Sequence, residues 1–257
     1  MFPFQSVPYF FFTLFTLLAP VFISGNQVSE TNASGSFEYP SAFREDPLSA
    51  SGASVAAEGL SLYHVMRLHE AGLSERAFLF AWKGYKKLLN EGRIQKKEVL
   101  SICDYSQSSK KKRLYIIDVG TQHLLLQTFV AHGRNSGGEY AQSFSNRPES
   151  YKSSLGFFVT RNTYFGTHGI ALNLDGLEKG INDRADDRKI VVHGSRYVGA
   201  SYLRHNPFIG RSLGCPAVPA KESQKIIGMI KDGSCFFIYH PTKKYIERSA
   251  QIGRAHV

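Results

Sequence analysis

The chain has 257 residues, of which 42% are hydrophobic, 13% aromatic and 20% charged. This composition excludes a wholly disordered chain, and the length suits one sizeable domain with a small helical addition. The net charge of +10 favours an anionic partner, such as nucleic acid, a membrane surface or an acidic polymer. The basic residues are spread along the chain without a nucleic-acid motif, so we predict no nucleic-acid partner.

The first 25 residues have the pattern of an export segment. An almost unbroken apolar run covers residues 9–23, and Pro20 interrupts it. The run is too short to span a membrane comfortably, and Ser24 and Gly25 supply the small residues of a cleavage site. No Lys or Arg precedes the run, which leaves a buried core segment as the alternative. We predict an exported protein that contacts a membrane only through residues 1–25, if this segment stays uncleaved.

A linker and two helices are expected next. Residues 26–57 are rich in Ser, Gly and Ala, which is typical of a flexible linker. The spacing of apolar residues predicts helices over 58–71 and 74–89, with Ser74 as the N-terminal cap of the second. Residues 58–92 are therefore expected to form a helical pair that packs on the main domain.

The main domain is expected over residues 93–245, where the pattern changes to short strands and turns. One helix interrupts the strands at 220–230, directly after Cys215, and 246–257 is expected to be a tail. The predicted fold class is therefore mainly β, within an α+β chain. The strands are predicted at 99–104, 113–119, 123–131, 156–161, 170–174, 190–193 and 234–240.

The three cysteines differ in their surroundings. Cys103 and Cys235 lie in apolar, strand-like runs, where a free thiol packs as a small hydrophobic side chain. The sequence leaves open whether these two form a disulfide. Cys215 stands in a turn between Gly214 and Pro216, which makes it the candidate reactive thiol. A structural cysteine in a Gly-Pro turn is the alternative that the residues alone leave open.

His193 is the candidate base for Cys215. It ends a β-branched run and is followed by Gly194, so its imidazole can face a cleft. An ordinary thiol is only a few per cent thiolate at neutral pH, and a base that removes its proton is worth ~10²–10⁴-fold in rate. Gly214 lets the backbone turn so that N–H groups converge on one point, as an oxyanion hole requires. No spacing resembles a zinc site, so we predict neither metal nor cofactor.

The motif H-G, seventeen residues and then S-x-G-C resembles the signature of YkuD-type L,D-transpeptidases. The ending C-P-A-V-P resembles the branch called the murein L,D-transpeptidase catalytic domain family. Further similar stretches lie at 131–137, 151–157, 166–169 and 177–182. The resemblance implies a YkuD-like β-sandwich catalytic domain with a helix after the catalytic cysteine. It also implies a cysteine acyltransferase of the periplasm or cell envelope.

The resemblance implies a substrate and a set of roles. Cys215 would attack the carbonyl that follows an L-configured centre in a peptidoglycan stem peptide, and an amine acceptor would resolve the thioester. His193 would be the base. The remaining positions shape the site: Gly194, whose carbonyl orients the imidazole, Ser212, which shapes the turn, and the N–H groups of Leu213, Gly214 and Cys215, which hold the oxyanion.

Two positions depart from the family pattern. Many relatives carry Arg or Asn two residues after the cysteine, where this chain has Ala217, and some carry His where it has Leu213. The contact to the substrate carboxylate must then come from elsewhere. The candidate substrate-binding residues are Leu213, His168, Arg134, Arg211 and Lys152.

The same thioester chemistry permits other outcomes. Resolution by water would make an L,D-carboxypeptidase, and resolution by a protein amine would make a wall-anchoring acyltransferase. A degenerate site would leave a non-catalytic wall-binding module. The expected partners are peptidoglycan stem peptides in each case.

Overall fold

The computed structural model describes residues 50–167 and 169–253, with side chains from residue 54 onward. The predicted export segment at 1–25 and most of the predicted linker lie outside the described residues. Residues 50–57 were expected in the linker but are helical, because helix α1 is Ala50–Val65. None of the helices in the described ranges combines the length and apolar content that a membrane span requires.

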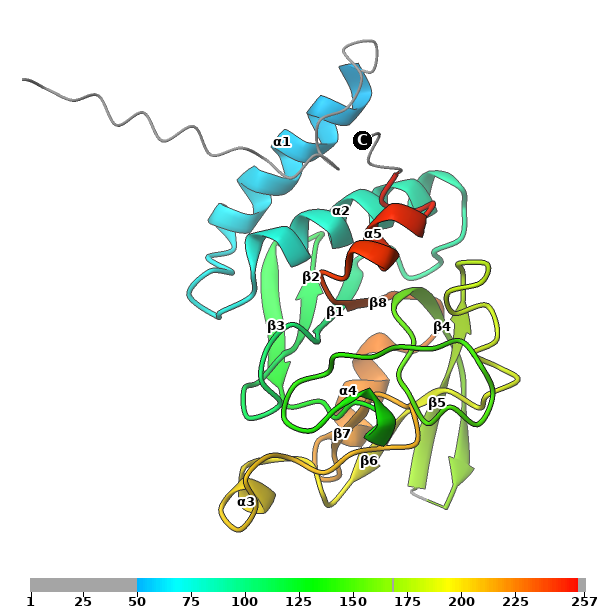
Figure 1. The fold of residues 1–257 in the computed structure, drawn as a ribbon. Coiled ribbons are helices and arrows are strands. Elements are labelled where there is room, and N and C mark those ends of the chain that lie inside the picture. The colour runs from blue at the N-terminus through cyan, green and yellow to red at the C-terminus, as the bar shows by residue number, and fades with distance from the viewer. Residues whose placement is uncertain (1–49, 168, 254–257) are drawn as a thin grey trace, which may run out of the picture. The chain divides into compact units, whose positions relative to one another are not determined.

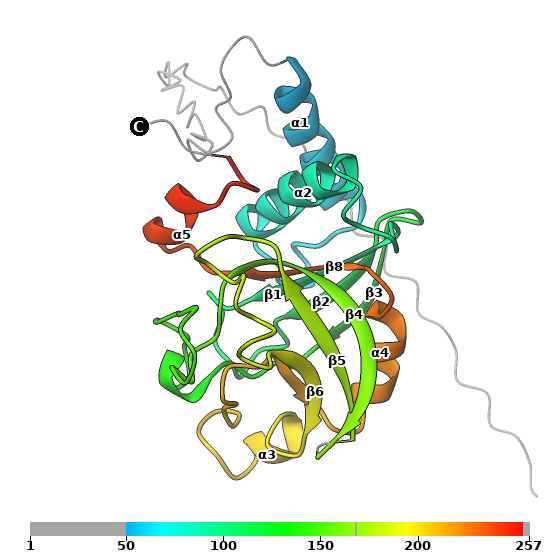
Figure 2. The same ribbon diagram turned by 90° about the vertical axis from the view of Figure 1, so that its right-hand side faces the viewer.

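Helix α1 and helix α2, Glu75–Asn90, lie against each other in Figures 1 and 2, although α1 ends at Val65 and not at residue 71 as predicted. Ser74 caps α2 as predicted, because its Oγ accepts a hydrogen bond from the Ala77 N–H at 3.2 Å. Just after the C-terminal end of α2, Gly92 has a φ of +67°, a left-handed conformation that glycine adopts without strain. Phe78 and Trp82 of α2 are buried, so the aromatic residues of this helix belong to the core.

Eight strands form one mixed sheet in the order β3-β2-β1-β8-β4-β5-β6-β7. The pairs β1–β8 and β6–β7 are parallel, and the other neighbouring pairs are antiparallel. The mainly β fold is confirmed, and every predicted strand is present, but the three-residue strand β7 was not foreseen. The strands are β1 Val99–Asp104, β2 Leu114–Asp118, β3 His123–Thr128, β4 Gly156–Gly166, β5 Gly169–Gly176, β6 Val191–Ser195, β7 Ala217–Pro219 and β8 Cys235–Tyr239.

The two edges of the sheet meet beyond β3 and β7. Ala131 follows β3 and pairs with Ala217 in β7, and its N–H donates to the Ala217 carbonyl at 2.8 Å. A second bridge joins Gly133 to Ser212. The expected sandwich is therefore one continuous sheet that nearly closes on itself. This closure satisfies backbone groups at the edges and brings residues 131–134 beside the turn that carries Cys215.

The helix predicted after Cys215 is α4, Ser223–Ile230. Its apolar face, which includes Ile226, Ile227 and Ile230, is fully buried, and the helix contacts β1, β5 and β6. The amphipathic pattern in the sequence therefore located this element correctly. Two further short elements are the 3₁₀ helix Arg134–Ser136 and helix α3, Ala200–Leu203.

Gly84 allows α2 to approach the sheet closely. A Cβ at this position would lie 2.1 Å from a carbon of the Phe157 ring in β4. Although alanine is the better helix former, we expect Gly84→Ala to lower the free energy of unfolding by about 1–3 kcal/mol, because the buried ring must move. Gly228→Ala in α4 is the matched control, since its Cβ would meet nothing within 4 Å. Equal thermal midpoints for the two variants would contradict this prediction.

The end of the chain packs on the domain, although 246–257 was expected to be a tail. Helix α5, Lys243–Arg248, extends into this region, and Ile246 and Ile252 are buried. The sequence missed this element because α5 is short and its apolar residues are few. Only 254–257 of the predicted tail lies outside the described residues.

A buried carboxylate anchors α5 to the sheet. Glu178 accepts hydrogen bonds from the Tyr245 hydroxyl at 3.1 Å and from the Ser249 hydroxyl. It also accepts the Phe157 N–H at 2.9 Å. These donors compensate for removing the carboxylate from water, which explains why an acidic side chain is buried here.

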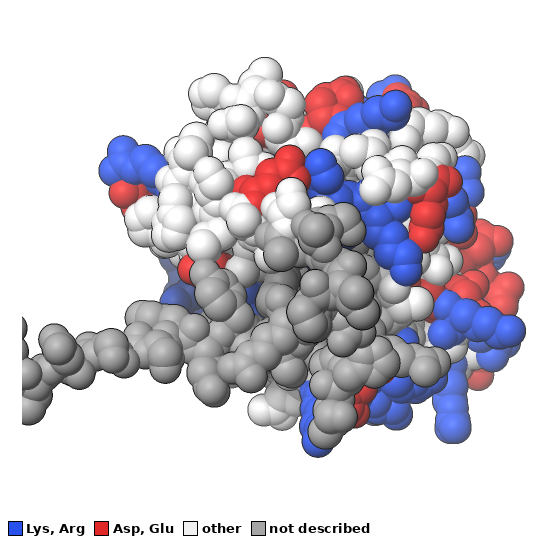
Figure 3. Space-filling view, turned by 90° about the horizontal axis from the view of Figure 1, so that it is seen from above, with Lys and Arg blue, Asp and Glu red and all other residues white. Residues whose placement is uncertain are grey.

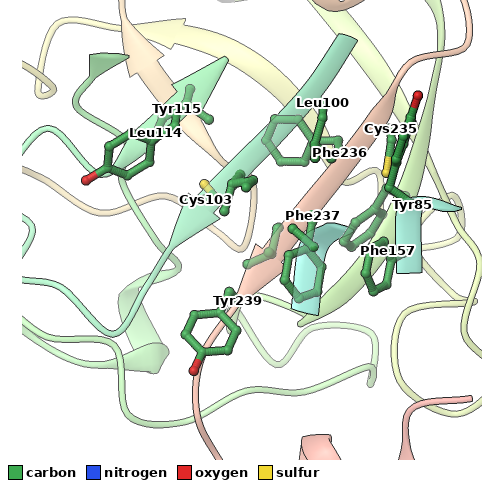
Figure 4. Close-up of a cluster of buried hydrophobic side chains, with 14 of the residues drawn as sticks. Tyr85, Leu100, Cys103, Leu114, Tyr115, Phe157, Cys235, Phe236, Phe237 and Tyr239 are labelled. Carbon is green, nitrogen blue, oxygen red and sulfur yellow. The ribbon is translucent and has the colours of Figure 1, made fainter. Parts of the chain in front are cut away.

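The three cysteines are free thiols. In the β1–β8 ladder Cys235 pairs with Leu100, so Cys103 lies three residues farther along β1 (Figure 4). Three residues of strand displace the two thiols by roughly 10 Å and place them on opposite faces of the sheet. A disulfide requires Cα atoms within about 7 Å, so this pair does not have the geometry for one.

Charged side chains of both signs share the surface. In Figure 3, Lys and Arg side chains alternate with Asp and Glu on the visible part of the face seen from above. The helical pair contributes exposed ion pairs such as Lys86–Glu58, with 3.2 Å between nitrogen and oxygen. Such pairs add little stability, but they keep the net positive charge from gathering in one patch on this face.

Candidate active site

Strands β6 and β7 bring His193 and Cys215 to one place. In their parallel register His193 lies beside Ala217. Extending this register by two residues puts Val191 beside Cys215, and the Val191 N–H points at Sγ from 3.5 Å. His193 and Cys215 both line one cavity of about 490 Å³. The two residues that stand out in the sequence therefore share a site.

The cavity around the thiol is basic. Its lining includes Arg188, Lys189 and Arg211, and no Asp or Glu of the described residues is part of it. Tyr164 and Tyr197 supply aromatic walls. Basic walls without acidic neighbours raise the local concentration of anions, so this cavity favours a ligand that carries a carboxylate.

The surroundings of the Cys215 thiol favour its protonated form. Burial raises the pKa of the Cys215 thiol, and the Val191 N–H and the Arg188 guanidinium lower it to a smaller extent. The S–H group is directed at the Lys189 carbonyl, which lies 3.5 Å from Sγ. Attack on a carbonyl carbon therefore requires a base that takes the proton during the reaction.

His193 has the orientation that such a base needs. Its ring is buried, and Nδ1 lies 3.1 Å from the Gly194 carbonyl oxygen. A carbonyl only accepts hydrogen bonds, so we assign the ring proton to Nδ1. Nε2 then carries the lone pair that can accept a proton. The family resemblance implies this same arrangement.

Gly194 is required for space. A Cβ on this residue would lie 2.7 Å from the Ser223 hydroxyl oxygen and 3.1 Å from the Ala220 Cα. Strand β6 therefore packs directly against the start of α4. Gly194 therefore has two roles in the H-G motif. Its carbonyl orients the His193 imidazole, and its lack of a side chain lets β6 approach α4.

Ser212 and Gly214 shape the turn before Cys215. The Ser212 hydroxyl donates to the Cys215 carbonyl at 2.6 Å and accepts the Gly214 N–H at 3.0 Å. Gly214 has a φ of +129°, and a Cβ there would lie 3.0 Å from the Lys152 carbonyl oxygen. The Gly214 N–H is thus directed at Ser212, so this one of the three expected oxyanion donors is engaged within the turn.

A buried arginine supports this turn from behind. Arg113 is fully buried and donates to the Val130 carbonyl at 3.0 Å and to His132 Nδ1 at 2.7 Å. Burial, together with Arg113, lowers the pKa of His132 to about 3, so this histidine is neutral. The His132 carbonyl accepts the Ser212 N–H at 3.0 Å. His132 therefore supports the turn that carries Cys215 instead of lining the cavity.

Two of the candidate substrate-binding residues line the cavity. Leu213 is 58% exposed at its edge. Arg211 also lines it, while its Nη1 donates to the Gly137 carbonyl at 3.1 Å. His168 lies outside the described residues, although Gly166 and Thr167 before it line the cavity.

Two other candidates do not line the cavity. The Arg134 guanidinium lies over the Tyr151 ring, 4.3 Å from its centroid. The Lys152 ammonium donates to the Ser143 hydroxyl at 2.7 Å. Their side chains therefore stabilise the loop beside the site and do not reach the space in front of Cys215.

Arg188 is one of two cavity-lining cations, with Lys189, that sequence reasoning missed. It lines the cavity, and its guanidinium donates to the carbonyls of Ser145, at 2.7 Å, and Lys152. In the sequence it stands in the charged run D-D-R-K, which is typical of a solvated turn. The only available signal was its place two residues before the strand predicted at 190–193.

No group of three or more His, Cys, Asp or Glu side chains within residues 50–167 and 169–253 is placed to hold a metal ion. The reactive and charged groups that line the cavity are a thiol, an imidazole and several cations.

The chain matches the family model described as L,D-transpeptidase catalytic domain over residues 69–239. This range includes α2 and ends at the last residue of β8. The family domain therefore begins before residue 93, where the main domain was expected to start. No curated protein matches the chain.

Several solved structures are similar to the chain. An L,D-transpeptidase from Mycobacterium smegmatis is 12% identical, with 56% of this chain and 59% of that chain covered and a TM-score of 0.34. LdtMt1, solved in complex with imipenem, is 9% identical, with 55% and 59% covered and a TM-score of 0.35. An L,D-transpeptidase from Stackebrandtia nassauensis is 16% identical, with 74% and 79% covered and a TM-score of 0.32.

The chain spans 59% of the length of the first two of these structures. Its family membership is carried by the family model, whose match covers well over half of the 257 residues and includes both His193 and Cys215. The protein belongs to the L,D-transpeptidase catalytic domain family.

Proposed function

We propose that this protein is an exported peptidoglycan L,D-transpeptidase with Cys215 as nucleophile and His193 as general base. The observation that carries the proposal is that both side chains line the cavity around Cys215, with the imidazole oriented by the Gly194 carbonyl. The cations that line the cavity around Cys215 suit stem peptides, because these substrates carry several carboxylates. Export rests on the apolar pattern of residues 9–23, and it places the enzyme in the periplasm or cell envelope.

The proposed reaction proceeds through a thioester. Sγ attacks the carbonyl carbon that follows the L-configured centre, and His193 accepts the thiol proton. The C–N bond to the terminal D-residue breaks, and His193 gives the proton to the departing amine. An acceptor amine then loses a proton to His193 and attacks the thioester. The C–S bond breaks, and His193 returns the proton to sulfur, which restores the enzyme.

Backbone donors stabilise the oxyanion in both halves of this proposed reaction. The N–H groups of Leu213 and Cys215 are the candidates, because the Gly214 N–H already serves Ser212. One such donor contributes roughly 3 kcal/mol to the transition state. If Ser212 releases Gly214 during the reaction, the turn gains a further donor.

The test of the proposal is product analysis with the purified full-length chain and disaccharide-tetrapeptide. We expect crosslinked dimers by mass spectrometry, and a carbapenem is expected to acylate the chain on Cys215. Tripeptide products without dimers would assign the chain to the L,D-carboxypeptidases, and transfer only to a protein amine would assign a wall-anchoring acyltransferase. The absence of all products and of any carbapenem adduct would overturn the proposal and leave a wall-binding module.

A further inference from the structure

We infer that a second cavity, formed between the loop at 142–147 and helix α5, binds a carboxylate-bearing segment of the wall peptide. We call it the basic cavity, and its volume is about 510 Å³. The inference rests on the proposed function for the identity of the polymer. It adds a binding site that is distinct from the cavity around Cys215.

The rim of the basic cavity carries three cations from two separate segments. Arg147 comes from the loop, and Lys244 and Arg248 come from α5. No Asp or Glu of the described residues lines the cavity, and none of the ion pairs among the described residues involves these three side chains. Three like charges that converge without a carboxylate favour an anionic ligand.

The acidic groups next to the basic cavity are already engaged by protein donors. Asp183 accepts the Asn146 side-chain amide at 2.6 Å and the Gly180 N–H at 2.8 Å. The carboxylate of Glu178 lies buried under α5 and accepts the Tyr245 hydroxyl at 3.1 Å. Both carboxylates lie outside the lining of the basic cavity, and none of the ion pairs among the described residues joins either of them to the three cations at the rim.

The floor of the basic cavity decides which anion fits. Phe144, Leu155, Ile181 and Tyr245 supply apolar surface, and Ser143, Ser145, Asn146 and Thr242 supply hydroxyl and amide groups. Inorganic phosphate would use only the rim. A peptide with aliphatic spacers and carboxylates uses the floor, the hydrogen-bonding walls and the rim together, and the volume lies within the usual range of about 300–1,000 Å³ for ligand sites.

The two cavities share a wall. Arg188 lines the cavity around Cys215, and its Nη1 donates at 2.7 Å to the carbonyl of Ser145, which lines the basic cavity. The Ser154 hydroxyl donates to the same carbonyl at 2.9 Å. A polymer that presents one stem peptide to Cys215 can therefore place another carboxylate-bearing segment in the adjoining cavity. Binding there adds affinity for the polymer without touching the reacting atoms.

The experiment removes the three charges by Arg147→Gln, Lys244→Gln and Arg248→Gln in one full-length chain. The matched control removes three exposed charges outside both cavities by Lys111→Gln, Lys112→Gln and Lys225→Gln. Calorimetric titration with disaccharide-tetrapeptide, on a Cys215→Ala background that blocks turnover, measures binding directly. We expect the rim variant to bind about tenfold more weakly than the control.

Three arms separate this inference from the proposed function. Carbapenem acylation of Cys215, measured in chains that keep the thiol, should be equal in the rim variant and its control. Stem peptide with amidated carboxylates should bind both chains equally weakly, and inorganic phosphate should compete poorly with the intact peptide. Equal affinity of both chains for the intact peptide would overturn the inference, and so would phosphate competition as strong as that of the peptide. Because binding is measured without turnover, the basic cavity is tested even if the chain proves not to be a transpeptidase.

Discussion

Cys215→Ala is expected to abolish both the acyl-enzyme and the crosslinked dimers. Alanine offers no nucleophile, and loss of the nucleophile in acyl-transferring enzymes lowers the rate by at least about 10⁴-fold. The fold should survive, because the substitution removes one sulfur atom whose hydrogen bonds, from the Val191 N–H and to the Lys189 carbonyl, are both long at 3.5 Å. Intact-protein mass spectrometry with a carbapenem and chromatography of the dimers measure the two losses.

Cys235→Ala is the matched control for this substitution. Cys235 is fully buried in β8 and does not line the cavity around Cys215. The control therefore loses some stability but keeps its activity per folded molecule. Dimers formed by the Cys215→Ala chain would contradict the proposed nucleophile. Equal loss of activity in both chains would mean that thiol substitution disturbs the fold instead of the chemistry.

Local patterns in the sequence were sufficient to predict most strands and to find His193 and Cys215. Alternating or β-branched runs predict strands directly, and a histidine at a strand end followed by glycine is a local feature. Strand β7 was missed because three residues, one of them Pro219, carry no pattern of their own. It forms because Ala217 pairs with His193 on one side and Ala131 on the other, which are contacts between distant segments.

The position of Ala217 also explains one departure from the family pattern. Its backbone pairs with β6 on one side and with Ala131 on the other, and its side chain is fully buried in a cluster with Val198 and Ile209. A residue held in this way has no access to a substrate in the cavity. The cations that do line the cavity, Arg188, Lys189 and Arg211, come from segments before β6 and before the turn. The sequence pointed to Arg211 but not to Arg188 or Lys189, because a basic residue in a charged turn looks the same whether it faces water or a site.

The role of Arg113 in supporting the turn before Cys215 could not be predicted from the sequence either. Arg113 follows a run of lysines, Lys110 to Lys112, which predicts a solvated loop. In the structure its guanidinium is fully buried and holds the segment that pairs with Ser212. Charge in the sequence indicates exposure on average, but backbone carbonyls and a neutral histidine ring can satisfy a buried guanidinium. Only the three-dimensional arrangement distinguishes these cases.

His193→Gln is expected to lower the rate of Cys215 acylation by a carbapenem at pH 7 by ~10²–10⁴-fold, the usual contribution of a general base. Glutamine has a similar size but accepts no proton at the imidazole position. Stopped-flow or mass-spectrometric acylation rates measure the loss. His205→Gln is the matched control, because His205 is exposed in the loop between the two site residues and does not line the cavity. Its acylation rate should equal that of the wild type.

The pH dependence of His193→Gln distinguishes a lost base from a disturbed fold. Without the imidazole, only the thiolate already present in solution reacts, and below the thiol pKa its fraction rises about tenfold per pH unit. Because burial raises the pKa of Cys215, the thiolate forms at higher pH than in an ordinary cysteine, and the residual rate should keep rising beyond pH 9. A misfolded chain would instead be slow at every pH. An acylation rate equal to that of the wild type at pH 7 would show that His193 is not the group that removes the thiol proton.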